Sequence, residues 1–260
     1  MWKAVFKVWN EGDHLQEALK RVYGLVDQII VIDGAYSYFP YKESERYNQP
    51  HSTDGTLDIV RDIGGIMPTW ERDSEVILIS NPGVPWKCET QMLNHIFRKY
   101  GKAGDYFFMI DGHELFEGDF HAEKERMVQG GWPIGKLVVC RPGDPRVDIP
   151  IEQYEGMQDR LRTKSQYRIL KWHPKLMLYR RHWNYMLPKG TLDELDNTRR
   201  NYTISTKIRL IHHTRNPERE RINLLHKKNL YKFRNDEINL LKWRRDNKVP
   251  DGKLGWNPDV

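Results

Sequence analysis

Short apolar runs alternate with segments of helical spacing over the first 111 residues. Residues 4–8, 28–32, 75–79 and 106–110 are rich in β-branched, aromatic and other apolar side chains, and the second run is almost wholly apolar, as in a strand covered on both faces. Between them, residues 14–23, 56–61 and 89–100 read as helices. This alternation predicts an α/β fold, a Rossmann-like and mostly parallel sheet flanked by helices.

The ends of two predicted strands carry acidic residues. Asp33 closes the run 28–32, and Asp111 closes the run 106–110. Parallel strands joined by right-handed crossovers place their carboxyl ends at one edge of the sheet, where ligands of open α/β folds bind. We therefore expect Asp33 and Asp111 at this edge.

The pattern changes after residue 131. Residues 134–141, 175–181 and 204–212 read as strands, and residues 218–245 as a basic amphipathic helix or helix pair, followed by an irregular tail over 246–260. We expect one domain over 1–215, with halves 1–119 and 120–215, and a basic helical extension over 216–260 packed on it.

Charge is distributed unevenly along the 260 residues. The net charge is +6, but residues 1–130 hold 14 Lys/Arg against 21 Asp/Glu, whereas residues 131–260 hold 28 against 15. This asymmetry indicates one part that holds cations and another that meets anions, such as nucleic acid, a lipid surface or a phosphorylated substrate. No sequence repeat and no apolar run long enough for a membrane helix is present.

The location of the protein is expected to be cytoplasmic. The first residues enter a strand-like run directly, which predicts no signal peptide. The two cysteines, Cys88 and Cys140, form neither a disulfide framework nor a CxxC pattern, and a reducing compartment follows as the default.

The tripeptide Asp111-Gly112-His113 is a candidate metal site. Residues i and i+2 of an extended segment project to the same side, so that a carboxylate and an imidazole could bind one ion. Gly112 lets the backbone turn close to a ligand. Mixed oxygen and imidazole donors suit Mn²⁺, and Mg²⁺ less well. The alternative is an aspartate that caps the turn beside a solvated histidine.

Four segments together resemble family 2-type glycosyltransferases of the GT-A fold. They are Val8-Trp9-Asn10-Glu11, the run Val26 to Gly34, Ser52-Thr53-Asp54-Gly55-Thr56, and Phe107 to Glu114. Their order and approximate spacing match that family over residues 4–119. The resemblance implies that the first two loops hold the nucleotide of an activated sugar. It also implies that Asp111 and His113 bind a divalent metal, Mn²⁺ or Mg²⁺, as a DxH variant of the family's DxD motif. The donor-binding residues implied are Val8, Trp9, Asn10, Glu11, Asp33, Gly34, Asp54, Lys87 and Gly112.

The sequence departs from the family's pattern at two places. Residues 35–51 separate Asp33 from the Ser52–Thr56 segment and carry five aromatic residues. They form either a flap with stacking faces for a base or sugar, or an aromatic loop packed on the domain. Gln91-Met92 stand where similar proteins often carry a Lys-Arg pair, so that a phosphate contact from that helix is in doubt.

Two fragments of the second half also resemble the family. One is Ile211 to Arg215, where related enzymes often place a histidine; His212 is the candidate third metal or diphosphate ligand and His213 the second choice, against a surface histidine pair. The other is Gly190 to Leu195, in which Glu194 or Asp193 would be the base of an inverting transfer, against an ordinary acidic first turn of a helix.

The predicted function is a metal-dependent, hexosyltransferase-type glycosyltransferase. It would move a sugar from a nucleotide-sugar donor such as a UDP- or GDP-sugar to a hydroxyl acceptor, by inversion. The basic second half leaves two alternatives open, a nucleic-acid-binding protein or a nucleotidyltransferase of related fold. We expect no nucleic-acid partner, because no recognised binding module is found, whereas the basic helix could rest on an anionic inner membrane face.

Overall fold

The computed structural model describes most of the first 144 residues and shorter parts of the remainder. The described residues are 1–37, 45–65, 74–81, 83–87, 89–144, 147, 149–151, 165–172, 177–178, 185–186, 203–213, 218 and 221. The predicted extension over 216–260 lies almost wholly outside them, so the division at residue 215 stays a prediction. Among the described residues, no helix combines the length and apolar character that a membrane span requires.

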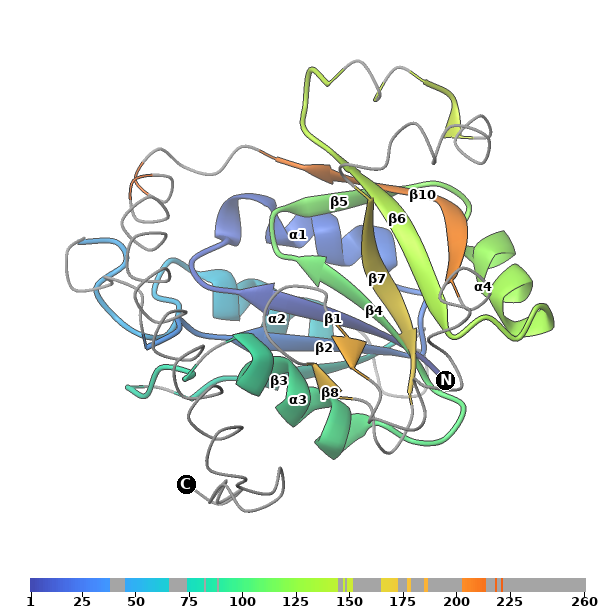
Figure 1. Ribbon diagram of the computed structural model, residues 1–260. Helices are drawn as coiled ribbons and strands as arrows, with labels where there is room; N and C mark the ends of the chain where they lie inside the picture. The colour runs from blue at the N-terminus through green and yellow to red at the C-terminus, as the bar shows by residue number, and fades with distance from the viewer. Residues whose placement is uncertain are drawn as a thin grey trace, which may run out of the picture.

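The first half forms the predicted alternation of strands and helices (Figure 1). Its elements are β1 (Trp2–Val8), α1 (Gly12–Val22), β2 (Gln28–Asp33), α2 (Thr56–Gly65), β3 (Glu75–Ile79), α3 (Glu89–Tyr100) and β4 (Tyr106–Asp111). The four strands are parallel neighbours in the order β3-β2-β1-β4. The α/β class that the sequence predicts, a Rossmann-like sheet flanked by helices, is confirmed here.

The second half extends the sheet with strands of both directions. Its elements are β5 (Glu114–Glu117), α4 (Phe120–Gln129), β6 (Ile134–Cys140), β7 (Ser165–Lys171), β8 (Met177–Leu178), β9 (Tyr185–Met186) and β10 (Thr203–His212). The eight-stranded order is β3-β2-β1-β4-β7-β6-β10-β5, with antiparallel pairing of β4 with β7, β7 with β6 and β10 with β5. The sheet as a whole is therefore mixed.

Four elements of this half, β5, α4, β7 and β9, were not predicted from the sequence. The strand expected over 175–181 is present as β8 at Met177–Leu178, and its other residues lie outside the described residues. The strands expected over 134–141 and 204–212 are present as β6 and β10, with ends shifted by one residue.

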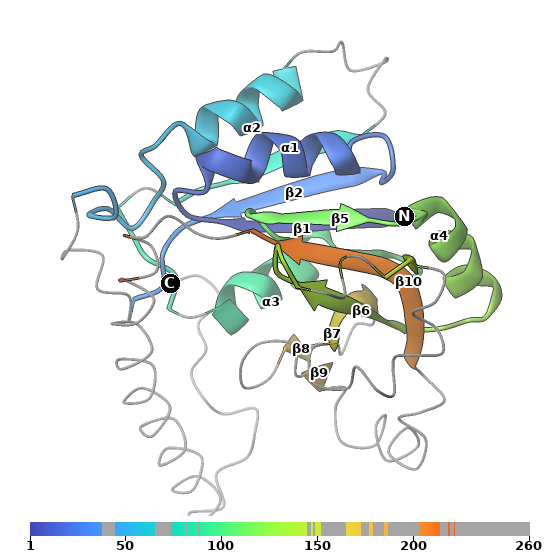
Figure 2. The ribbon, with the colours of Figure 1, turned by 90° about the horizontal axis from the view of Figure 1, so that it is seen from above.

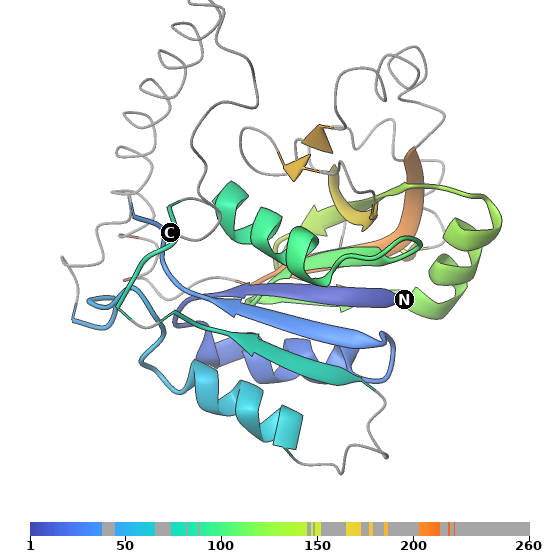
Figure 3. The ribbon, with the colours of Figure 1, turned by 90° about the horizontal axis from the view of Figure 1, so that it is seen from below.

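Helices cover both faces of the parallel strands. Figures 2 and 3 show α1 and α2 on one face and α3 on the other. One apolar cluster joins Phe6 of β1 to Leu15 and Leu19 of α1, and a second joins Val5 of β1 to Ile96 of α3. Every residue of β1 is buried, including two lysines.

The crossovers reverse direction between β1 and β4. The chain leaves β1 through α1 on one face and enters β4 from α3 on the other, so a topological switch lies between these two neighbouring strands. Crevices at such a switch, beside the carboxyl ends of the strands, are where open α/β sheets bind ligands. Val8 and Asp111 end the two strands at this place.

Candidate metal centre

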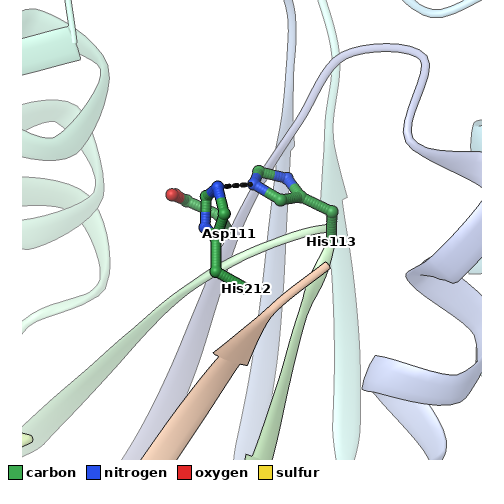
Figure 4. A group of neighbouring side chains, drawn as sticks. All are labelled: Asp111, His113 and His212. Carbon is green, nitrogen blue, oxygen red and sulfur yellow. Dashed lines mark hydrogen bonds between the residues drawn. The ribbon is translucent and has the colours of Figure 1, made fainter. Parts of the chain in front are cut away.

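Three side chains from two distant parts of the chain converge at the carboxyl end of β4. Asp111 ends β4, His113 lies in the turn that follows, and His212 ends β10. One ligand atom from each lies within 4.8 Å of the others, as Figure 4 shows. The pairing of β10 with β5 produces this arrangement, because it sets His212 opposite Glu114, the residue after His113.

The two imidazole rings face each other through their Nε2 atoms. These atoms are 3.2 Å apart, and a carboxylate lies on the Nδ1 side of each ring. Nδ1 of His113 is 3.1 Å from Oε2 of Glu11, and Nδ1 of His212 is 3.3 Å from Oε1 of Glu114. The two Nε2 atoms form a hydrogen bond whose direction depends on the tautomers of the rings. A metal ion bound by both Nε2 atoms would take the place of this hydrogen bond.

Two buried cations contact Asp111 from the neighbouring strands. Nζ of Lys7 in β1 lies 2.8 Å from Oδ1 of Asp111 and also contacts Glu89 at the start of α3. Nη2 of Arg168 in β7 lies 3.8 Å from Oδ2 of Asp111 and 2.7 Å from Oε1 of Glu114. Both cations are buried, so each needs these carboxylates as partners.

The charges of the cluster determine its protonation. Burial raises the pKa of Asp111, but Lys7, Arg168 and His113 outweigh burial and hold that pKa well below its ordinary value. Burial lowers the pKa of Lys7, yet Asp111 and Glu89 raise it overall. The pKa of Glu114 is raised by burial and lowered more strongly by Arg168, so it too lies below its ordinary value. The carboxylates of the site are therefore ionised.

Several acidic groups meet in the contacts around Asp111. Asp111, Glu114, Glu89 and Glu11 contact Lys7, Arg168 and the two imidazoles. One carboxylate with two imidazoles is a donor set that suits Mn²⁺ and similar transition ions better than Mg²⁺. The residues present thus fit a divalent metal.

Hydrogen bonds fix the loop after β1, and Glu11 of this loop contacts His113. Asn10 has a left-handed backbone with φ of 52°, and its N–H donates to Oγ of Ser52 over 2.7 Å. Ser52 in turn donates to the carboxylate of Asp33, which also accepts from Ser80. Glu11 follows Asn10 and contacts His113. Asp33 and Asn10 therefore hold the loop that positions Glu11.

Asp33 itself is buried, and its surroundings are polar. Burial raises the pKa of Asp33, although the hydrogen bonds from Ser52 and Ser80 lower it in part. Gly34, with φ of +136°, follows it, and a Cβ there would lie 3.0 Å from the Trp86 ring. The structure places both residues at the expected sheet edge, packed against protein groups. Their role in donor binding stays a prediction.

Asp54 connects the starts of two helices. Its carboxylate accepts from the N–H of Gly12 at the start of α1 and from Thr56 at the start of α2. Arg46 lies 3.1 Å from the same carboxylate and so neutralises part of its charge. Asp54 thus fixes the loop geometry on this side of the site.

Gly112 allows two segments to approach closely. A Cβ on Gly112 would lie 2.9 Å from Cγ1 of Val8 and 3.0 Å from Cβ of Glu11. The small residue therefore brings the turn after β4 against the loop after β1, and its expected approach to a ligand stays a prediction.

The aromatic residues of the expected flap are only partly described. Tyr47 is buried against Trp9, with ring centroids 5.2 Å apart, and Nε1 of Trp9 donates to the carbonyl of Gln49. For these residues the packed-loop alternative is the one observed. Three of the five aromatic residues, Tyr38, Phe39 and Tyr41, belong to residues 38–44, which lie outside the described residues.

The remaining predicted site residues are Lys87, His213, Glu194 and Asp193. Lys87 is exposed, and its backbone N–H donates to Oε1 of Gln91. The ring of His213, the second choice for the third ligand, stacks on the ring of His14 with centroids 4.9 Å apart. The backbone N–H of His213 donates to the carbonyl of His113. Burial and then His14 lower the pKa of His213. Glu194 and Asp193 lie outside the described residues.

Sequence reasoning missed the supporting residues of this centre. Glu114 was part of a quoted motif without a role, and Lys7 was only one of several possible cations. Arg168 was not considered. The one available signal was the placement of Lys7 and Glu114 directly beside strand runs, where charged residues need partners.

Comparisons with known proteins give likenesses only at the level of structure. No family of known sequences matches the chain, and no curated protein matches it. Among solved structures, the chain is similar to glucosyl-3-phosphoglycerate synthase from Mycobacterium tuberculosis, in complex with Mn²⁺, UDP and glucosyl-3-phosphoglycerate. The identity is 12%, the TM-score is 0.46, and 88% of this chain and 77% of that chain are covered.

Two further solved structures are similar over different lengths. A mycobacterial protein has 13% identity and a TM-score of 0.48, with 88% of this chain and 72% of that chain covered. TarS of S. aureus has 14% identity and a TM-score of 0.33, with 53% of this chain covered. The match spans only 21% of the length of TarS.

Proposed function

We propose that this protein is a metal-dependent glycosyltransferase that moves a sugar from a nucleoside-diphosphate sugar to a hydroxyl acceptor. The observation that carries the proposal is the convergence of Asp111, His113 and His212 at the switch between β1 and β4. One carboxylate and two imidazoles can bind a divalent cation, and a cation at the carboxyl ends of parallel strands is well placed to meet a diphosphate.

The proposed ligands are Asp111, His113 and His212. Mn²⁺ bound by these residues would supply Lewis-acid stabilisation of the charge that develops on the departing nucleoside diphosphate. Lys7 and Arg168 hold the Asp111 carboxylate ionised and in place, since both contact it inside the buried network. Glu11 and Glu114 fix the imidazoles from their Nδ1 sides.

The donor would lie along the loop that follows β1. This loop continues from Val8, the last residue of β1, through Trp9 and Asn10 to Glu11. The hydrogen bonds of Ser52 and Asp54 hold it against the starts of α1 and α2. A fixed loop lowers the entropic cost of positioning the donor before transfer. Asp33, Gly34, Lys87 and Gly112 complete the proposed donor-binding set.

The acceptor side is proposed from the sequence resemblance alone. Glu194 or Asp193 would take the proton from the acceptor hydroxyl as its oxygen forms the bond to the anomeric carbon and the bond to the diphosphate breaks. This assignment belongs to an inverting transfer, in which the base and the leaving group are on opposite faces of the sugar.

The proposed function is tested by screening UDP-, GDP- and dTDP-sugars for hydrolysis in the presence of Mn²⁺. We expect release of the nucleoside diphosphate from one donor class, loss of that release with EDTA, and its loss in Asp111→Ala. Asp119→Ala is the matched control, because Asp119 only caps α4 through the N–H of Ala122. Full activity of Asp111→Ala would remove the metal assignment.

A further inference from the structure

We infer that Glu114 is the positioning residue that assembles the metal centre, by holding His212 in register with Asp111. This inference rests on the proposed function, because it concerns the same metal. Glu114 lies at the start of β5, its side chain is fully buried, and each of its oxygens has a partner from another strand.

Three strands meet at the Glu114 carboxylate. Oε2 accepts the backbone N–H of Asp111 in β4 over 2.8 Å. Oε1 accepts from Nη2 of Arg168 in β7 over 2.7 Å and lies 3.3 Å from Nδ1 of His212 in β10. One side chain therefore contacts the backbone of one metal ligand and the ring of another.

Arg168 makes Glu114 rigid. Its guanidinium also donates to the carbonyl of Met109 over 3.3 Å and to Oε1 of Gln166 over 2.9 Å, so it is held on three sides. A carboxylate whose own partners are fixed limits the rotation of the imidazole that it contacts, and such outer contacts typically contribute about 10- to 100-fold to metal affinity. Glu11 stands in the same relation to His113, from the loop after β1.

The chain offers a matched control on the same strand. Glu117 ends β5, and its carboxylate pairs with Nε of Arg209 in β10 over 2.6 Å. Glu114 and Glu117 thus both link β5 to β10 by a charged contact, but only Glu114 contacts a residue of the metal centre. A general loosening of the β5–β10 pairing would affect both variants, whereas a positioning role affects Glu114 alone.

The experiment measures Mn²⁺ binding to the full chain by electron paramagnetic resonance of free Mn²⁺, and records the visible spectrum of the Co²⁺-loaded protein. In Glu114→Gln we expect the dissociation constant for Mn²⁺ to rise about 10- to 100-fold and the Co²⁺ bands to shift. In Glu117→Gln the dissociation constant for Mn²⁺ and the Co²⁺ bands should stay as in the unchanged protein. Glu114→Asp, which keeps the negative charge beside Arg168 but shortens the reach to His212, is the second variant in case Glu114→Gln fails to fold, and it should weaken Mn²⁺ binding in the same way.

The possible results separate this inference from the proposed function. If the unchanged protein binds no Mn²⁺, both are overturned. If it binds Mn²⁺ but Glu114→Gln binds equally well with an unchanged Co²⁺ spectrum, the positioning role alone is overturned. Where Glu114→Gln does not fold, equal binding and an unchanged spectrum in Glu114→Asp overturn the role. An equal loss in Glu117→Gln also overturns it, because the effect would then belong to the β5–β10 pairing.

Discussion

The two ends of β1 carry the same pair of residues in different surroundings. At the amino end, Lys3 lies 2.8 Å from Asp105, just before β4, and at the carboxyl end Lys7 lies 2.8 Å from Asp111, the last residue of β4. Both lysines are buried and project to the side of the sheet that α3 covers, where their partners and the carbonyl of Tyr100 are found.

The difference lies in what surrounds each aspartate. Asp105 meets Lys3, the α-amino group of Met1 and the N–H of Lys102, so its negative charge is fully matched. Asp111 contacts Lys7 and Arg168 and also lies beside two imidazoles, those of His113 and His212. The comparison teaches that a buried Lys–Asp pair is not by itself a sign of function. The two imidazoles beside Asp111 distinguish the carboxyl end from the amino end.

The largest expected effect is the loss of either buried lysine. Lys3→Met and Lys7→Met each remove the nearer of two cations from a buried carboxylate, which should cost about 3–5 kcal/mol of unfolding free energy. Urea unfolding with and without Mn²⁺ measures the contrast. Mn²⁺ should restore part of the loss in Lys7→Met only, because the ion neutralises Asp111. Lys20→Met, at an exposed position of α1, is the control and should change stability by less than about 0.5 kcal/mol. Equal restoration in Lys3→Met would contradict the distinction between the two ends.

Replacing Asp105 or Asp111 by asparagine tests whether the two ends of β1 differ in their effect on metal affinity. Asp111→Asn should weaken Mn²⁺ binding by about 100-fold, which is about 2.7 kcal/mol, because it removes the anionic ligand. Asp105→Asn should lower the unfolding free energy and leave Mn²⁺ binding as it is. Isothermal titration with Mn²⁺ on both variants measures this, and a similar loss of affinity in both would show that the amino-end pair also supports the site.

The smallest expected effect is a pH dependence at the amino end. Burial raises the pKa of Asp105, but the hydrogen bond from Lys3 and other partners lower it below the ordinary value of 3.8. The unfolded chain therefore binds the proton more readily, so the stability that Asp105 contributes is complete above about pH 4 and is lost as the pH falls through the lowered pKa. The difference in unfolding free energy between the unchanged protein and Asp105→Asn should shrink below pH 4. A difference that stays constant down to pH 2 would be inconsistent with this ion pair.

The sequence predicted well where local pattern decides the structure. The apolar runs ending at Val8, Asp33 and Asp111 identify β1, β2 and β4, and the i, i+2 spacing of Asp111 and His113 places both beside one edge. His212 was a candidate because the resemblance places a histidine at this position, at the end of a predicted strand. The structure brings it to the other two residues, while metal binding itself stays a prediction.

The residues that support the centre depend on contacts across the sheet. Arg168 sits between Tyr167 and Ile169 in β7, and carboxylates 54 and 57 positions away in the sequence neutralise its buried charge. The lysines of β1 alternate as if they faced solvent, whereas both faces of that strand are covered. No local pattern encodes such partners, because the pairing of β7 with β4 and of β10 with β5 creates them.

The position of β10 has a consequence for the newly made chain. His212 follows His113 by 99 residues and enters between strands already present, since β10 pairs with β6 on one side and β5 on the other. A nascent polypeptide that has emerged only as far as residue 203 offers Asp111 and His113 alone. In the proposed metal site, the third ligand would therefore arrive with β10, the last sheet strand among the described residues, and a shorter nascent chain would hold only two of the three proposed ligands.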